Sequence, residues 1–161
     1  MPESARAMSR WLLLAAAIIF LDQASKQWVL ESFRLHETRV VTGFFNLVLV
    51  FNPGAAFSFL AGAGGWQKWF FLGLALVISA WLLAMLRNHA GERLLPLALS
   101  LIIAGALGNA IDRLRFDAVV DFLDFHVAGY HWPAFNVADS AITVGVALML
   151  LQQFLQPKDP Q

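Results

Sequence analysis

The residues of this sequence that could do chemistry are mostly aspartates in apolar surroundings. Asp121 lies in the stretch Val119-Val120-Asp121-Phe122, and Asp139 follows eighteen residues later, just after Asn136. Apolar surroundings can raise the pKa of a carboxyl group, and two carboxylates held together can share one proton. Such a pair can activate a water molecule and protonate a leaving group, as in aspartic proteases. The intervening loop contains Gly129 and Pro133, so the spacing permits the two side chains to meet.

Each of these acids also has a purely structural interpretation. Asp121 and Asp124 could belong to an amphipathic interfacial segment whose acids face water. Asn136 could be the N-cap of a helix in which Asp139 occupies the third position, where a carboxylate is favourable near the positive helix end. For Asp139 the sequence pattern alone favours this capping role, which is compatible with a chemical role.

A second set of polar residues is typical of packing and support. Asp22 and Lys26 are spaced i, i+4 on one helical face, which favours an internal ion pair that braces the fold. Asp112 is followed directly by Arg113, and this sequence indicates a structural ion pair between the two. Asn109, three residues before Asp112, suits either a structural or a functional role.

The run Asn52-Pro53-Gly54-Ala55-Ala56-Phe57 combines a turn signal with small residues. It is equally consistent with a tight turn after a strand and with a place where the backbone approaches a ligand closely. His126 and His131 could ligate a metal together with the nearby aspartates, but their spacing matches no tight metal motif. The chain has no cysteine, which excludes disulfides and thiolate chemistry.

These residues must be positioned by a membrane-embedded scaffold. Apolar residues make up 59% of the 161 residues and charged residues 14%, against roughly 45–50% and about 25% in soluble domains. The sequence predicts an all-α membrane protein with four transmembrane helices in a single domain. The predicted helices span residues 11–30, 66–86, 94–112 and 137–155. A surface β region is predicted over about residues 38–60, where β-branched and aromatic residues alternate with turn signals.

Helix parity places the polar residues on one side of the membrane. The end of the first helix, the end of the third and the start of the fourth share a side, together with both long connections. Of the eleven carboxylates, only Glu3, Glu92 and Asp159 fall on the other side. Lysine and arginine divide almost evenly between the two sides, so the positive-inside rule does not assign the cytoplasmic side. The net charge is zero, so the chain has no overall positive charge that would favour binding to nucleic acid.

Five blocks of this sequence, taken together and in order, resemble the lipoprotein signal peptidases (signal peptidase II). The blocks are Leu21-Asp22-Gln23-Ala24-Ser25-Lys26, Asn52-Pro53-Gly54-Ala55-Ala56-Phe57, Gly108-Asn109-Ala110-Ile111-Asp112-Arg113, Val119-Val120-Asp121-Phe122 and Phe135-Asn136-Val137-Ala138-Asp139-Ser140. The resemblance covers nearly the whole chain. It implies four transmembrane helices, a small extracytoplasmic β-sheet and a short surface helix.

The resemblance also implies an activity and a set of site residues. The enzyme would remove signal peptides from diacylglyceryl-modified prolipoproteins, cleaving before the lipidated cysteine, in the bacterial cytoplasmic (inner) membrane. Both termini would be cytoplasmic and the active site near the outer face, with membrane lipid and prolipoproteins as partners, a monomeric state, and no metal or other cofactor. Asp121 and Asp139 match the catalytic aspartates. The substrate-binding positions would be Asn52, Gly54, Asn109, Arg113 and Asn136, and the supporting positions Asp22, Lys26, Asp112 and Ala138.

Three alternative functions remain open at this point. Intramembrane carboxylates also mark ion pathways, so a small ion- or proton-coupled transport subunit is the main alternative. A metal-dependent membrane hydrolase using His126 and His131 is the second. A scaffold subunit, in which every acid is a cap or an ion-pair partner, is the third.

Overall fold

Four long helices dominate the structure. The computed structural model describes residues 3–54 and 66–155. The helices are α1 (Glu3–Ser32), α2 (Trp66–His89), α3 (Leu94–Phe116) and α4 (Val137–Leu155). All four are long and apolar enough to cross a membrane, which confirms the predicted four-helix architecture. The first helix differs most from its predicted range, because α1 begins at Glu3 and includes the polar residues that precede the apolar run.

Helix α3 lies at the centre of the bundle and packs against each of the other three helices. About 67% of its apolar span is buried, whereas the corresponding share is 17% in α2 and in α4. Small residues allow α4 to approach α3 closely. A methyl group added at Gly105 would lie 2.3 Å from the backbone oxygen of Ala138, and one at Gly145 would lie 2.8 Å from that of Ala98.

A small antiparallel sheet continues the bundle at one end. Its strands are β1 (Thr38–Thr42), β2 (Phe45–Asn52), β3 (Val119–Val127) and β4 (Tyr130–His131), in the order β1-β2-β3-β4. β1 and β2 fall in the predicted β region, of which residues 55–60 lie outside the described residues. β3 was not predicted as a strand; its acids belong to the sheet and not to a separate interfacial segment. The short surface helix is not among the helices of residues 3–54 and 66–155.

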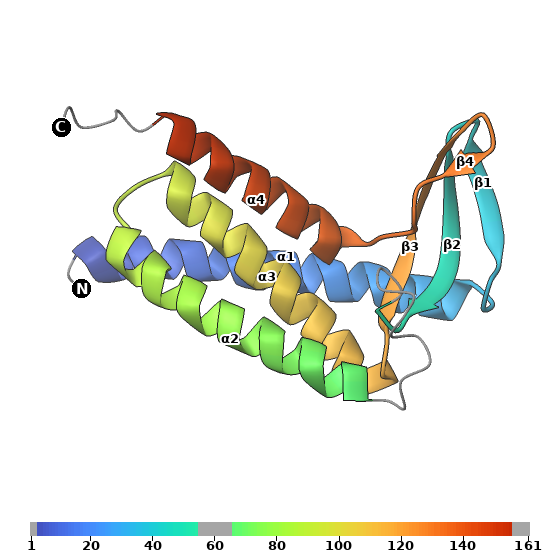
Figure 1. Ribbon diagram of the computed structural model, residues 1–161, viewed down its shortest axis with the longest axis horizontal. Coiled ribbons are helices and arrows are strands. Elements are labelled where there is room, and N and C mark those ends of the chain that lie inside the picture. Colours follow the sequence, from blue (N-terminus) through green and yellow to red (C-terminus); the bar gives the residue numbers. More distant parts are fainter. Residues whose placement is uncertain (1–2, 55–65, 156–161) are drawn as a thin grey trace.

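The sheet and the link between α2 and α3 lie at opposite ends of the molecule (Figure 1). The start of α1 and the end of α4 lie at the same end as that link. The segment that contains β3 and β4 runs from the end of α3 to the start of α4, so the sheet connects the two helices that pack most closely. The predicted polar residues of α3, β3 and α4 therefore converge at the junction between bundle and sheet.

Candidate active site

Asn136 joins the two aspartates that the sequence singled out. Its side-chain amide donates a hydrogen bond to Oδ1 of Asp121 at 2.8 Å. Its side-chain oxygen accepts a hydrogen bond from the backbone N–H of Asp139 at 2.8 Å. Asn136 is fully buried, so neither contact competes with bulk water. The structure thus brings Asp121 of β3 and Asp139 of α4 to opposite ends of one amide side chain.

The start of α4 is a reciprocal cap. While the Asn136 side chain accepts from the N–H of Asp139, the Asp139 carboxylate accepts from the N–H of Asn136 at 3.3 Å. This is the capping-box arrangement, which satisfies backbone donors at a helix start. The cap and the convergence of the two aspartates coexist, because the cap leaves Oδ1 of Asp139 available to other donors.

Two further asparagines hold the aspartates. Asn109 of α3 donates to Oδ1 of Asp139 at 2.7 Å, and Asn52, at the end of β2, donates to Oδ2 of Asp121 at 3.0 Å. All of these side-chain partners are neutral amides. They orient the carboxylates without supplying the positive charge that would hold both aspartates ionised.

The environment of Asp121 favours its protonated form. The residue lies in β3, outside the four helices, and only 1% of its surface is exposed. Burial and the nearby charge of Asp139 raise the pKa of Asp121 to about 7, although hydrogen bonds from Asn52 and Asn136 act in the opposite direction. A carboxyl group with such a pKa can carry a proton near neutral pH and exchange it during a reaction.

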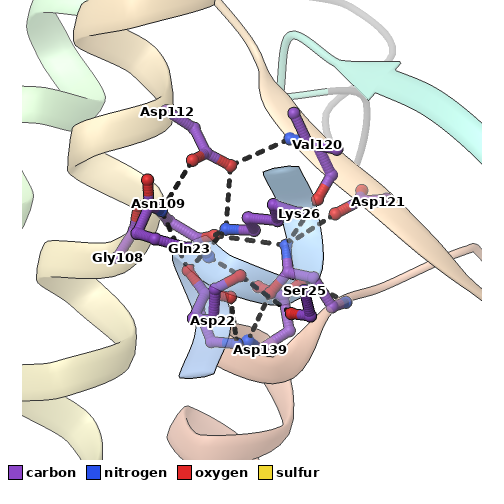
Figure 2. A network of polar contacts seen from close by, with 12 residues as sticks. Asp22, Gln23, Ser25, Lys26, Gly108, Asn109, Asp112, Val120, Asp121 and Asp139 are labelled. Carbon is purple, nitrogen blue, oxygen red and sulfur yellow. Dashed lines mark hydrogen bonds and ion pairs between the residues drawn. The ribbon is translucent and has the colours of Figure 1, made fainter. Parts of the chain in front are cut away.

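A second carboxylate cluster lies next to the first and is built around the ammonium of Lys26 (Figure 2). The ammonium of Lys26 lies 2.8 Å from Asp22 and 2.8 Å from Asp112, and it donates to Oδ1 of Asn109 at 3.0 Å. Lys26 and both aspartates are essentially inaccessible to solvent. A buried cation with this many oxygen partners is well compensated, which is the condition for tolerating it in the interior.

The buried cluster also holds the backbone next to each candidate catalytic residue. Oδ1 of Asp22 accepts from the N–H of Ala138 at 2.9 Å, and Oδ2 of Asp112 accepts from the N–H of Val120 at 3.0 Å. Ala138 precedes Asp139 and Val120 precedes Asp121. The cluster therefore fixes the positions of both candidate catalytic aspartates through their neighbours, with Asn109 linking the two sets of carboxylates.

The ion pair predicted between Asp112 and Arg113 is not formed; Asp112 pairs with Lys26 instead. Consecutive helical residues point in different directions, so Asp112 faces α1 while Arg113 does not. Arg113 donates to the backbone oxygen of Asn109 at 3.3 Å, and its guanidinium lies 5.0 Å from the ring centre of Phe71. Arg113 is partly exposed beside the two aspartates, where it could meet a substrate.

The Asn52 turn packs against the same aromatic ring. The N–H of Gly54 donates to the Asn52 side chain at 3.0 Å, and Gly54 has a φ of 108°, which favours glycine. A methyl group added at Gly54 would lie 2.7 Å from the Phe71 ring. Asn52, Gly54 and Arg113 thus gather around Phe71, whose role the sequence did not indicate. Residues 55–57 of this block lie outside the described residues.

Gln23 is a second site residue that the sequence analysis missed. Its amide donates to Oδ1 of Asp112 at 2.9 Å and to the backbone oxygen of Gly108 at 3.2 Å. It thereby ties α1 to α3 beside the Lys26 cluster. The residue stands in the quoted block between Asp22 and Lys26, but its contact depends on how α1 is rotated against α3, which one-dimensional spacing does not specify.

Asp124 and the histidines form a separate cluster on the sheet. Asp124 accepts hydrogen bonds from Asn46 at 2.8 Å and from the ring of His131 at 2.9 Å, and the rings of His126 and His131 stack 4.9 Å apart. Burial raises the pKa of the Asp124 carboxyl, but the hydrogen bonds from Asn46 and His131 outweigh it and leave a lowered value. Within residues 3–54 and 66–155, no three His, Asp or Glu side chains are grouped as metal ligands would be.

An apolar groove leads to the aspartate pair. A pocket of about 490 Å³ beside Asp139 is lined by Trp132, Phe135, Ser140, Thr143 and Val144. Trp132 and Phe135 also line a second pocket, of about 770 Å³, on the sheet. The two pockets share the side chains of Trp132 and Phe135, which line both the hollow on the sheet and the groove beside Asp139 at the start of α4.

Most of the chain is similar to one family of known bacterial membrane proteins. A family model described as Signal peptidase (SPase) II matches residues 14–155. A lipoprotein signal peptidase of Azoarcus sp. (strain BH72) is 63% identical over 91% of this chain and 84% of its own length, and one of Yersinia enterocolitica is 50% identical over 93% and 89%. A bacterial membrane enzyme solved by the in meso method at 1.9 Å resolution superposes with a TM-score of 0.82 at 32% identity, covering 92% of this chain and 95% of that one.

Proposed function

Because the chain belongs to the signal peptidase II family, we propose that it is an aspartyl endopeptidase whose catalytic residues are Asp121 and Asp139. The observation that carries this proposal is the bridging of both aspartates by Asn136, with neutral amides as their other side-chain partners. The substrate would be a prolipoprotein whose cysteine bears a diacylglyceryl group, cut at the bond before that cysteine.

The proposed reaction needs one ionised and one protonated aspartate. The raised pKa of Asp121 supports Asp121 as the carrier of the proton and Asp139 as the base. Asp139 removes a proton from water, and the resulting nucleophile attacks the carbonyl carbon before the lipidated cysteine while Asp121 protonates the carbonyl oxygen. Collapse of the tetrahedral intermediate breaks the C–N bond. The amine of the cysteine leaves with the proton that Asp139 had taken, and Asp121 recovers its own.

The surrounding residues divide into two proposed groups. Asn52, Gly54 and Arg113, which gather around Phe71 at the partly exposed side of the pair, would contact the peptide backbone of the substrate. Asn109 and Asn136, also predicted to bind substrate, donate to the aspartates, which supports a positioning role as well. The supporting residues would be Asp22, Lys26, Asp112 and Ala138, whose contacts join α1, α3 and α4.

The apolar groove supports a lipid-bearing substrate. Trp132 is 70% exposed and Val144 51% exposed, so the groove beside Asp139 has an apolar wall open to the surroundings of α4. In a membrane those surroundings are lipid chains. The acyl chains of the substrate could therefore remain in the bilayer while the scissile bond reaches Asp139, and the signal peptide would lie against the sheet.

We place the protein in the bacterial inner membrane as a single-domain monomer that needs no cofactor. Both termini would be cytoplasmic and the aspartates near the outer face, where prolipoproteins arrive after translocation. The clustering of the acids at one end of the bundle supports an enzyme over a transport subunit, because an ion pathway needs polar groups at several depths.

A cleavage assay in detergent tests the proposal. Purified protein would be incubated with a diacylglyceryl-modified prolipoprotein and with the unmodified form, and the products separated by gel mobility. Asp121→Asn and Asp139→Asn would be compared with Asp124→Asn, a matched variant in the same strand whose carboxylate belongs to the separate histidine cluster. A chelator arm addresses the metal-dependent alternative.

We expect cleavage of the lipidated form only, lost in Asp121→Asn and Asp139→Asn, retained in Asp124→Asn and unaffected by chelator. Intact substrate with folded wild-type protein would overturn the peptidase assignment and favour the transport or scaffold alternatives. Cleavage that survives both substitutions would keep the peptidase and exclude this catalytic pair.

A further inference from the structure

A second polar site lies at the end of the bundle that is remote from the aspartates. A pocket of about 470 Å³ is formed there by Arg10 and Trp11 of α1, Arg93 just before α3, and Leu94 and Leu97 in its first turn. This is the end where the α2–α3 link lies, opposite the sheet (Figure 1). The residues come from two segments more than eighty positions apart in the chain, so the pocket is a product of the fold.

The pocket is built on a fixed aromatic side chain. The indole N–H of Trp11 donates to the backbone oxygen of Ala90 at 3.0 Å, which ties α1 to the α2–α3 link. The guanidinium of Arg10 lies over the Trp11 ring, 4.9 Å from its centre. A tryptophan that is hydrogen-bonded at one edge loses little freedom when a ligand binds, so this part of the site is preorganised.

The charge of the pocket is uncompensated. Arg10 and Arg93 are both exposed, and neither takes part in any ion pair of the part of the chain that the structure describes. Glu92 is adjacent to Arg93 in sequence but is not paired with it. Arg6, one helical turn before Arg10, is also exposed and adds to the positive field at this end. Two unpaired guanidinium groups at one pocket select for an anion, and phosphate oxygens suit guanidinium geometry.

The position of the pocket decides which phosphate it meets. Arg10 and Trp11 stand where the apolar stretch of α1 begins, and Arg93 stands where that of α3 begins, so both arginines lie at the level of lipid headgroups. Leu94 and Leu97 form an apolar wall on the hydrocarbon side of the arginines. A ligand that places a phosphate between two arginines and a chain along leucines has the chemistry of a phospholipid.

We propose that this pocket binds the headgroup of an anionic phospholipid of the bilayer, with its phosphate between Arg10 and Arg93 and its acyl chains along Leu94 and Leu97. Basic pockets between transmembrane helices are a known way of holding anionic lipids. The site is independent of the aspartate pair, and the bound lipid would clamp the start of α1 to the α2–α3 link at the end of the bundle that lacks a sheet.

Lipid binding by the purified full-length protein tests the proposal. Retained lipids would be counted and their dissociation constants measured by native mass spectrometry, and thermal unfolding would be followed with phosphatidylglycerol, phosphatidylethanolamine or inorganic phosphate. The test variant is Arg10→Gln/Arg93→Gln. The matched control is Arg87→Gln, an exposed arginine in the last turn of α2 at the same end, outside the pocket.

We expect wild type and Arg87→Gln to bind phosphatidylglycerol more tightly than phosphatidylethanolamine and to be stabilised by it. The double variant should lose about 10- to 30-fold in affinity for phosphatidylglycerol, as two interfacial arginines imply, and should unfold at the same temperature as wild type without added lipid. Unchanged preference in the double variant would overturn the proposal. An equal loss of affinity for phosphatidylglycerol in Arg87→Gln would also overturn it, because it would indicate a diffuse surface charge. Equal thermal stabilisation by inorganic phosphate would overturn it as well, because it would indicate a simple anion site.

Discussion

Four buried or half-buried aspartates lie side by side at one end of this bundle, and they differ in what faces them. Asp22 and Asp112 share the ammonium of Lys26, whereas Asp121 and Asp139 are held by neutral asparagine amides. A buried carboxylate beside a cation has its charge compensated by that partner. One held by amides beside another carboxylate can share a proton. In the proposed mechanism, the partner therefore decides which aspartates support the fold and which react, since the residue type is the same.

The largest expected effect comes from neutralising the pair whose side-chain hydrogen-bond partners are neutral amides. Asp139→Asn and Asp121→Asn should each lower the cleavage rate by about 10²- to 10⁴-fold, because proton transfer by positioned groups contributes on this scale. Their unfolding temperatures should fall much less than the rate does, since asparagine has the same shape and its oxygen can keep one of the two hydrogen bonds that each carboxylate accepts. Single-turnover cleavage and thermal unfolding in detergent measure the two quantities.

The same change in the other pair provides the contrast. Asp22→Asn should reduce stability more than Asp139→Asn does and reduce the rate much less, because it weakens the partner of Lys26. An equal loss of cleavage rate in both variants, without loss of stability, would show that pairing with Lys26 does not separate a supporting pair from a catalytic pair.

Removal of the shared cation should have the next largest effect. Lys26→Met leaves Asp22 and Asp112 buried without their positive partner, and breaking a buried ion pair in this way costs about 3–5 kcal/mol. The free energy of unfolding or the yield of folded protein would report it. A triple variant with Asp22→Asn and Asp112→Asn added should recover part of the loss, because no charge is then left unpaired. A triple variant as unstable as Lys26→Met alone would contradict this explanation.

A smaller effect should follow from separating α3 and α4. Gly105→Ala places a methyl group against the backbone oxygen of Ala138 and against Ile142. Overpacking of this kind costs about 1–3 kcal/mol, and the shift of α4 should displace Asp139 and lower the cleavage rate. Gly73→Ala is the matched control in α2, since nothing lies within 4 Å of the added methyl group. Similar losses in both variants would mean that close α3–α4 contact is not what positions Asp139.

The smallest effect should be a shift in pH dependence. With the pKa of Asp121 raised to about 7, kcat/KM should fall as the pH rises through about 7, because Asp121 then loses the proton that it supplies. Asn52→Ala removes a hydrogen bond that lowers the pKa of Asp121, so the decline in kcat/KM should occur at a higher pH than in wild type. Asn46→Ala is the matched control, because Asn46 lies in the same strand as Asn52 but donates its side-chain amide to Asp124. A decline in kcat/KM at a lower pH in Asn52→Ala would contradict the assignment of Asp121 as the proton donor.

The same raised pKa has a consequence for stability with a definite sign. In the unfolded chain the Asp121 carboxyl has its ordinary pKa of 3.8. Between about pH 4 and about pH 7 the folded protein therefore holds more of this proton than the unfolded chain. The contribution of Asp121 to the free energy of unfolding should fall as the pH rises through this window and stay constant above it. Asp121→Asn should remove this dependence, which unfolding temperatures measured between pH 4 and pH 8 would show.

The local features of the fold could be predicted from the sequence, whereas the partners across helices could not. Apolar runs of membrane-spanning length predict the four helices, and the Asn136–Asp139 spacing predicts a cap, because both depend on neighbours in the chain. The pairing of Asp112 with Lys26, and not with Arg113, depends on how α3 is rotated relative to α1. The roles of Gln23 and Phe71 depend on the same rotations. β3 was missed because its partner β2 lies some seventy residues earlier in the chain.

The hydrogen bond from the N–H of Ala138 to Asp22 joins residues that are 116 positions apart in the chain. During synthesis α1 leaves the ribosome first and α4 last, so Asp22 and Lys26 are in the membrane long before Asn136 and Asp139 exist. A nascent chain or a truncated product that ends before Asn136 therefore has one aspartate of the pair and no Asn136 amide to bridge it. If Asp121 and Asp139 are the catalytic pair, proteolytic activity would arise only once the start of α4 has been made and has joined α1.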